Sequence, residues 1–114
     1  MKIVNEKISI TELSEMSKRM FGRLVKAVVD IEKGIMAVDS ELHVDEEQLL
    51  LENESTQENL WGINLYPGRY PNENWIEFDS MINLRPVQGN ETRGVDDLHI
   101  REKIINIVAR LVCQ

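Results

Sequence analysis

The feature that most constrains the fold is the alternation of apolar and polar side chains across residues 24–44, interrupted at residues 33–34 by Lys-Gly. Alternation on both sides of a glycine-containing turn is typical of a long β-hairpin. We predict that Glu32 faces Ile35, because this pairing gathers most apolar side chains on one face. A shift of one residue would move them to the other face. The predicted pairs are Ile31/Met36, Val29/Val38, Ala27/Ser40 and Val25/Leu42 on the apolar face, with Lys26 opposite Glu41 on the other.

A helix is predicted near the start of the chain, over residues 10–21. Ser9 and Glu12 match a capping box, in which the two side chains bind the first free backbone groups of a helix. Apolar side chains then recur at helical spacing on one face, at Ile10, Leu13, Met16 and Met20. Gly22 follows the last turn, where a left-handed residue commonly ends a helix.

A second helix is predicted at the other end of the chain. Either Asp96 or Asp97 supplies the capping oxygen, and both alternatives remain open. The apolar face consists of Ile100, Ile104, Ile107, Val108 and Leu111, and Ile105 and Val112 widen it. A face this broad predicts the most deeply packed helix of the chain.

Two further strands are predicted over residues 60–66 and 75–84, where apolar residues again alternate. Residues 45–54 fit either a short helix capped by Asp45 or a short strand, and periodicity does not decide between them. Together these elements predict an α+β fold with a single domain over residues 1–114. We expect an antiparallel sheet of four or more strands, with an N-terminal and a C-terminal helix packed on one face and the other face partly open.

Charge and cysteine content exclude several classes of protein. A formal charge of −7 over 114 residues counts against sequence-independent binding of nucleic acid. No apolar run approaches the ~18 residues of a membrane span. Cys113 is the only cysteine, so no intramolecular disulfide can form, and the first residues do not resemble a signal peptide. We therefore expect a cytoplasmic protein that binds neither nucleic acid nor membrane and needs no cofactor.

The negative charge is concentrated in residues 39–56, which hold seven acidic residues and no lysine or arginine. The seven are Asp39, Glu41, Asp45, Glu46, Glu47, Glu52 and Glu54. Because charges balance in the rest of the chain, this segment predicts a surface for a basic protein partner. The open sheet face and the broad C-terminal helix also suit a symmetric homodimer.

Part of this segment is a candidate metal site. If it lies on a strand, alternate residues project from one side and offer oxygen and nitrogen ligands to a divalent ion. These residues are Asp39, Glu41, His43 and Asp45. Residues two apart on a strand are roughly 6.5–7 Å from each other, too far to converge without a bend. The alternative is a solvated polar face on which Lys26 pairs with Glu41.

The loop over residues 85–97 is a candidate anion site. Arg85, Asn90 and Arg93 offer charged and amide donors just before a helix N-terminus, a combination that suits a carboxylate or a phosphate. The spacing matches neither a P-loop nor a Rossmann motif. The alternative is that an aspartate caps the helix while the arginines pair with nearby carboxylates.

Glu77 and Asp79 share one face of the strand predicted over residues 75–84. Paired carboxylates divide acid and base roles where their environments differ. We expect Asn64 and Asn83 to extend this polar face, with Trp75 and Tyr66 at its border. The alternative is a hydrated sheet face with no catalytic role.

The second half of the chain carries the motifs LWGINLYP (60–67), INLRP (82–86) and GNETRGVDD (89–97). Together with the preceding VVDIEKGIMAVDSELHVDEEQLLLENES, they resemble a small bacterial family catalogued only as a domain of unknown function. The resemblance covers nearly the whole chain and implies a short prokaryotic cytosolic protein, without supplying an activity, a cofactor or a catalytic residue. Members of the family often carry glycines near positions 40 and 54, where this chain has Ser40 and Glu54, and this departure argues against tight turns there.

No nucleophile, metal or nucleotide signature accompanies these residues. The sequence therefore favours a binding or interaction module without chemistry of its own. The alternative is a small enzyme or ligand-binding domain that takes an anionic small molecule near residues 85–97, with Arg85 and Arg93 holding the anion beside the open sheet face.

Overall fold

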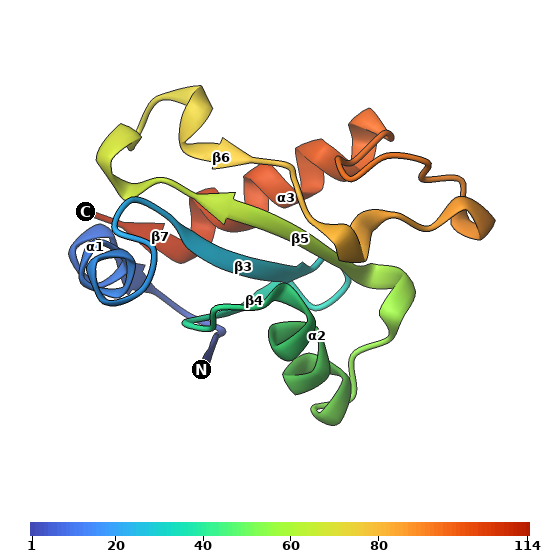
Figure 1. The fold of residues 1–114 in the computed structure, drawn as a ribbon, viewed down its shortest axis with the longest axis horizontal. Helices are drawn as coiled ribbons and strands as arrows, with labels where there is room; N and C mark the ends of the chain where they lie inside the picture. Colours follow the sequence, from blue (N-terminus) through green and yellow to red (C-terminus); the bar gives the residue numbers. More distant parts are fainter.

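The computed structural model describes residues 1–114 and has a five-stranded sheet at its centre (Figure 1). Every pair of neighbouring strands in this sheet is antiparallel. In spatial order the strands are β1 (Lys2–Val4), β4 (Ile35–Val38), β3 (Val25–Asp30), β5 (Leu60–Leu65) and β6 (Ile76–Glu77). The predicted α+β class and the antiparallel sheet of at least four strands are confirmed.

Helices and one small sheet surround this core. The α-helices are α1 (Ile10–Arg19), α2 (His43–Glu52) and α3 (Leu98–Leu111). Strand β2 (Ile8–Ser9) pairs in parallel with β7 (Val112–Cys113). Single 3₁₀ turns are η1 (Gln57–Asn59), η2 (Pro67–Arg69), η3 (Glu73–Trp75), η4 (Met81–Asn83) and η5 (Pro86–Gln88). No helix combines the length and the apolar character needed to cross a membrane.

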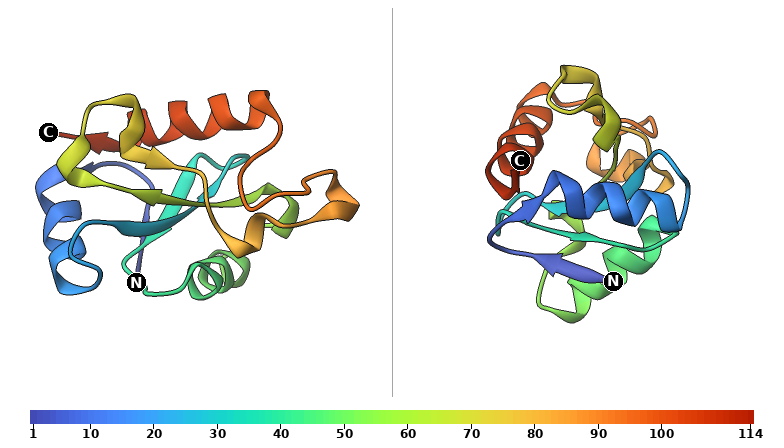
Figure 2. Two further views of the ribbon diagram at one scale, coloured as in Figure 1. Left: turned by 45° about the horizontal axis from the view of Figure 1, so that its top comes forward. Right: turned by 90° about the vertical axis from the view of Figure 1, so that its left-hand side faces the viewer.

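The helices do not all lie where the sequence pattern predicted. Helices α2 and α3 lie on opposite sides of the sheet, and α1 lies across one end of it (Figure 2). A common face for the two terminal helices is therefore not confirmed, and the second face of the sheet has a helix of its own.

Local signals at the helix ends agree with the sequence. The Ser9 hydroxyl accepts the Glu12 N–H (3.0 Å), and Gly22, at φ +86°, donates to the Ser17 carbonyl (2.6 Å). Asp97 caps α3 by accepting the His99 N–H (2.8 Å). The apolar face of α3 is narrower than predicted, because the Ile105 side chain is 43% exposed. Val112 has left the helix and belongs to β7.

The predicted β-hairpin is present in the structure, but its predicted register is wrong by two residues. Asp30, and not Glu32, faces Ile35, because residues 31–34 form the turn. The buried carboxylate of Asp30 stabilises this turn by accepting the N–H groups of Glu32 and Lys33 and the Ser55 hydroxyl. A shift of two residues keeps every side chain on its predicted face.

The second strand of the hairpin is also shorter than predicted. It ends at Val38, and Asp39 takes a left-handed conformation at φ +71°. Glu41 is therefore not in the sheet, and its predicted pairing with Lys26 is wrong. The chain does turn tightly next to Ser40, and Glu54 is itself left-handed at φ +73°. The missing glycines weaken a prediction of tight turns at these positions, yet the chain turns there without them.

Residues 45–54 fall mostly in a helix, which resolves the open alternative. Helix α2 begins at His43, so Asp45 lies inside the first turn and does not cap it. The residue at the cap is Leu42, whose N–H binds the Ser40 hydroxyl (3.2 Å).

Alternate residues of the central strands pack into two separate apolar clusters. Odd-numbered side chains such as Val29 and Ile63 join side chains from α1 and α3 in the larger cluster. The even-numbered Val28 and Leu60 join Leu50 of α2 in the smaller one. Because α2 has only ten residues, roughly 15 Å of helix, it covers only part of its face of the sheet.

The strand predicted over residues 75–84 is mostly absent. Strand β6 stops at Glu77, and the chain then crosses Gly62, where a Cβ atom would lie 2.5 Å from Ser80 Cβ. Beyond this crossing the Asn83 side chain replaces the missing strand. Its Oδ1 accepts the Gly62 N–H (2.8 Å), and its Nδ2 donates to the Gly62 and Arg93 carbonyls (2.9 Å each).

Candidate functional site

The part of the sheet that α2 leaves uncovered is hollowed into a cavity of about 530 Å³, which we call the central cleft. Lys26 of β3 and Asn64 of β5 are direct neighbours in the sheet and both line it. The start of α2, strand β6 and Arg93 complete its walls. The lining residues are Phe21, Leu24, Lys26, Leu42, His43, Val44, Asn64, Tyr66, Glu77, Asp79, Ser80, Met81, Ile82 and Arg93.

His43 is the first residue of α2 and is held in a defined orientation. Its Nε2 lies 2.8 Å from the Ile63 carbonyl oxygen. Since a carbonyl only accepts, Nε2 is the protonated nitrogen, and Nδ1 carries a lone pair in the neutral ring. Burial lowers the pKa of His43, with a smaller contribution from the positive charge of Lys26. The ring is therefore neutral at pH 7, and its Nδ1 is an acceptor with no partner in the protein.

Asn64 and Tyr66 bind the same carboxylate, that of Glu77. Asn64 Nδ2 donates to Glu77 Oε1 (2.8 Å) and to the Asp79 carbonyl (3.2 Å). The Tyr66 hydroxyl also donates to Glu77 Oε1 (3.1 Å). Burial and this hydrogen bond raise the pKa of Tyr66, which keeps the phenol protonated as the donor.

The other end of the Asn64 amide has no partner. Asn64 is only 7% exposed, and its Oδ1 is an enclosed acceptor without a hydrogen bond. Because Nδ2 already binds two acceptors, the amide cannot flip without losing both. A buried acceptor left unpaired costs about 1–3 kcal/mol, so a donor from a ligand at this point would be stabilising.

Positive and negative groups balance within the cleft. Arg93 Nε donates to Asp79 Oδ1 (2.8 Å), and both side chains are about half exposed. Lys26 Nζ lies 5.0 Å from the centroid of the Phe21 ring. Glu77 is the second carboxylate that lines the cleft, after Asp79. The two cations are thus matched by two carboxylates, which disfavours a ligand that is only an anion.

Apolar side chains surround the mouth of the cleft. Phe21, Leu42, Val44 and Met81 all line it, and each is exposed to solvent. Clustered exposed apolar side chains around polar groups are typical of binding surfaces, whereas scattered ones are not. The cleft therefore combines a polar interior with an apolar rim.

Arg85 lies outside the cleft and has a structural role, contrary to its prediction as an anion ligand. Its guanidinium donates to the Gln57 carbonyl (2.6 Å) and the Leu60 carbonyl (2.7 Å), and its centre lies 4.2 Å from the Trp61 ring centroid. Burial lowers the pKa of Arg85. Nη1 and Nη2 thus bind the backbone, and Nε is buried without a partner.

Asn90 is also structural. Its Nδ2 donates to the carbonyls of Asn83, Thr92 and Gly94, and its Oδ1 accepts the Asp96 N–H (2.8 Å). All its hydrogen-bonding groups are therefore used in holding the loop together. Of the five residues predicted to bind a ligand, Glu77, Asp79 and Arg93 line one cavity, and Arg85 and Asn90 do not.

The residues predicted as metal ligands do not share a strand face, because β4 ends before them. Asp39 Oδ1 lies 3.4 Å from Arg19 Nη2. His43 lines the central cleft from α2. Glu41 and Asp45 are exposed. No group of three or more His, Cys, Asp or Glu side chains is arranged to share a metal ion.

The acidic segment over residues 39–56 is less uniformly charged than its sequence implies. Glu46 and Glu47 are buried. Burial raises the pKa of Glu46 to about 10, so this carboxyl is neutral at pH 7. The exposed charges that remain are on Glu41, Asp45, Glu52 and Glu54.

Two residues of the cleft were given other roles by the sequence pattern. Lys26 was paired with Glu41, and His43 was placed among metal ligands. The register of β3 against β5 makes Lys26 and Asn64 neighbours on the face of the sheet that carries the smaller apolar cluster. This register is a feature of the fold, which the pattern of either strand alone does not reveal.

The fold and the cleft define a small α+β protein with a polar cavity on one face of an antiparallel sheet. The chain belongs to the family described as "Protein of unknown function (DUF5674)", which matches residues 2–111. This confirms the resemblance found in the sequence, and the description assigns no activity. No curated protein and no solved structure matches the chain.

Proposed function

We propose that this chain is a binding module without chemistry of its own, whose central cleft takes a small polar molecule that donates hydrogen bonds. The unpaired Oδ1 of the buried Asn64 carries this proposal. Nδ1 of His43 is a second acceptor without a partner, and both groups are held in place by their other hydrogen bonds. The cavity of about 530 Å³ lies within the roughly 300–1,000 Å³ that small-molecule sites occupy.

An anionic ligand near residues 85–97 has less support. Nη1 and Nη2 of Arg85 and the amide of Asn90 donate to the backbone, and Arg93 is paired with Asp79. The carboxylate of Glu77 would repel an anion in the same space. Amines, amides and hydroxyl compounds fit the available acceptors better.

The test is a thermal-shift screen of primary amines, amides, polyols and nucleobases. A ligand specific for the folded state raises the melting temperature. We expect at least one such compound, and we expect Asn64→Leu to weaken its binding about tenfold, the value of one buried hydrogen bond. His43→Phe is the second variant, because phenylalanine keeps an aromatic ring but has no acceptor in place of Nδ1, and it should also weaken binding.

Asn106→Leu is the matched control, since Asn106 is exposed on α3 and far from the cleft in sequence and structure. A hit that Asn64→Leu retains at full affinity contradicts the site. A panel without any hit contradicts the small-molecule proposal and favours a protein partner at the same place.

The apolar rim supports a protein partner as the second candidate. Leu42 and Val44 lie in the acidic segment beside the exposed Glu41 and Asp45. A segment with both apolar and basic side chains complements this surface, and a second copy of the chain is the other partner we consider. We infer a bacterial cytoplasmic setting, which the lone Cys113 supports because it excludes an intramolecular disulfide.

A further inference from the structure

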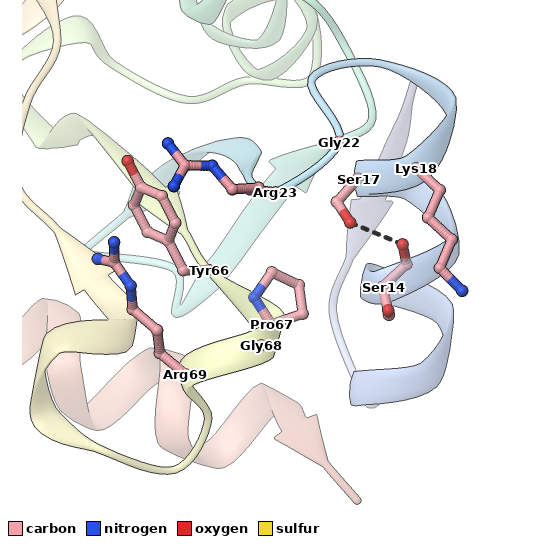
Figure 3. A pocket seen from close by; sticks show the side chains of 9 residues that line it. All are labelled: Ser14, Ser17, Lys18, Gly22, Arg23, Tyr66, Pro67, Gly68 and Arg69. Atoms are coloured by element: carbon pink, nitrogen blue, oxygen red, sulfur yellow. Dashed lines mark hydrogen bonds between the residues drawn. The ribbon is translucent and has the colours of Figure 1, made fainter.

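A second, smaller cavity lies between α1 and the turn η2 (Figure 3). Its volume is about 230 Å³, below the roughly 300 Å³ at which cavities begin to hold whole drug-sized ligands. Lys18, Arg23 and Arg69 line it, and no acidic residue does. In a chain with a formal charge of −7, this is an unusual concentration of positive charge.

The two arginines lie close to the same aromatic ring. The guanidinium carbon of Arg69 is 4.0 Å from the centroid of the Tyr66 ring. Figure 3 shows the guanidinium of Arg23 beside that ring as well. The side chain of Arg69 makes one hydrogen bond, a long one of 3.4 Å to the Asn74 carbonyl, and the side chain of Arg23 has neither a hydrogen bond nor an ion pair. The donors of both groups are thus largely unused.

Lys18 differs from the arginines. Its Nζ lies 3.7 Å from Glu15 on the same helix, and in Figure 3 its ammonium group points away from the two guanidinium groups. Neither arginine forms an ion pair with a carboxylate. The free positive charge in the cavity is therefore that of Arg23 and Arg69.

We propose that this cavity binds the phosphoryl group of a small phosphate monoester, with Arg23 and Arg69 as the anion ligands. Two like charges near one ring repel each other, and an anion between them removes that repulsion. A carboxylate has two oxygens, which a single guanidinium saturates, whereas a phosphoryl group has three oxygens and a second negative charge for a second guanidinium. The site is separate from the central cleft and does not depend on the ligand proposed there.

The test is an NMR titration with inorganic phosphate at constant ionic strength, followed at the Gly22 and Gly68 amides, which line the cavity. We expect saturable shifts at both amides and stronger binding of phosphate than of acetate. Arg23→Gln and Arg69→Gln should each weaken phosphate binding about tenfold or more, as expected for a charge-assisted hydrogen bond.

Lys18→Gln and Lys103→Gln are the matched charge controls. Lys103 is exposed on α3 outside the cavity. Each control removes one positive charge, so each should weaken binding by less than about threefold through long-range attraction alone. Equal losses in Arg23→Gln and Lys103→Gln would overturn the site, as would acetate binding as tightly as phosphate or the absence of saturation.

Discussion

Glu46 illustrates how burial changes the meaning of a single residue. Its side chain is completely buried in α2, Oε2 accepts the Ser40 N–H (3.2 Å), and Oε1 has no partner. Burial raises the pKa of Glu46 from 4.5 to about 10. The folded molecule is therefore one unit less negative at pH 7 than its formal charge, and the acidic segment loses part of its attraction for a basic partner.

This residue should give the protein an unusual pH dependence of stability. Between pH 4.5 and 10 the folded state holds a proton on Glu46 that the unfolded state has released, so the free energy of unfolding falls as pH rises. The slope for one proton is at most about 1.4 kcal/mol per pH unit. The lowered pKa of His43 acts in the opposite direction, but only below 6.5, so the window from pH 7 to 9 isolates Glu46.

Urea denaturation of the wild type and Glu46→Gln at pH 7, 8 and 9 measures this effect. Glutamine keeps the acceptor for Ser40 and cannot ionise, so the variant should lose most of the fall in stability. Glu102→Gln on the exposed side of α3 is the control and should follow the wild type. Parallel curves for wild type and Glu46→Gln would show that Glu46 is ionised in the folded state.

At the scale of elements, the Asn83 side chain makes hydrogen bonds to β5 that a neighbouring strand would otherwise make. Strand β6 ends at Glu77, and the Asn83 amide then binds both backbone groups of the buried Gly62. Asn83→Ala leaves the Gly62 N–H and carbonyl without these partners, whereas the Arg93 carbonyl still accepts the Ser80 N–H (2.9 Å). Since each unpaired buried group costs about 1–3 kcal/mol, the variant should lose at least about 2 kcal/mol of stability.

Chemical denaturation tests this expectation, with Asn106→Ala as the exposed control. The control should change stability by no more than about 0.5 kcal/mol. If Asn83→Ala is as stable as the control, then Gly62 finds other partners and the amide is not needed to continue the sheet.

The elements that sequence reasoning predicted well are those with signals in their own residues. Ser9 and Gly22 mark the ends of α1, and strand β5 matches the alternation around Trp61. The hairpin was predicted with the correct faces but with a register wrong by two residues. Alternation has a period of two and cannot detect such a shift, and the Asp30 carboxylate that fixes the turn also binds Ser55, far along the chain.

The site was only partly predictable for the same reason. Glu77 and Asp79 lie two residues apart, so their proximity follows from the local sequence. Arg85 looked free because its partners are backbone carbonyls of residues 57 and 60, which no sequence pattern identifies. His43 looked like a strand residue because the apolar alternation of the hairpin continues past the point where β4 ends.

At the scale of the molecule, the cleft exists because the two faces of the sheet are covered unequally. The larger cluster joins side chains of α1 and α3 to odd-numbered side chains of the central strands, and α2 is the one α-helix that contributes to the smaller cluster. A short helix on a five-stranded sheet leaves part of that face open, and the polar residues Lys26 and Asn64 occupy the open part. The short length of α2 therefore both limits the size of the smaller apolar cluster and leaves room for the central cleft.

This unequal construction predicts unequal local stability, which amide hydrogen exchange measures. Strand β3 lies between two strands and is buried on both faces at Val28 and Val29, so its amides should exchange only through global unfolding. Gly62 lies where the sheet is completed by a side chain, and its amide should exchange faster through local detachment of residues 78–84. Asn83→Ala should then accelerate hydrogen exchange of the Gly62 amide more than that of the Val29 amide. Equal acceleration at both amides would mean that the edge and the centre of the sheet open together, as one cooperative unit.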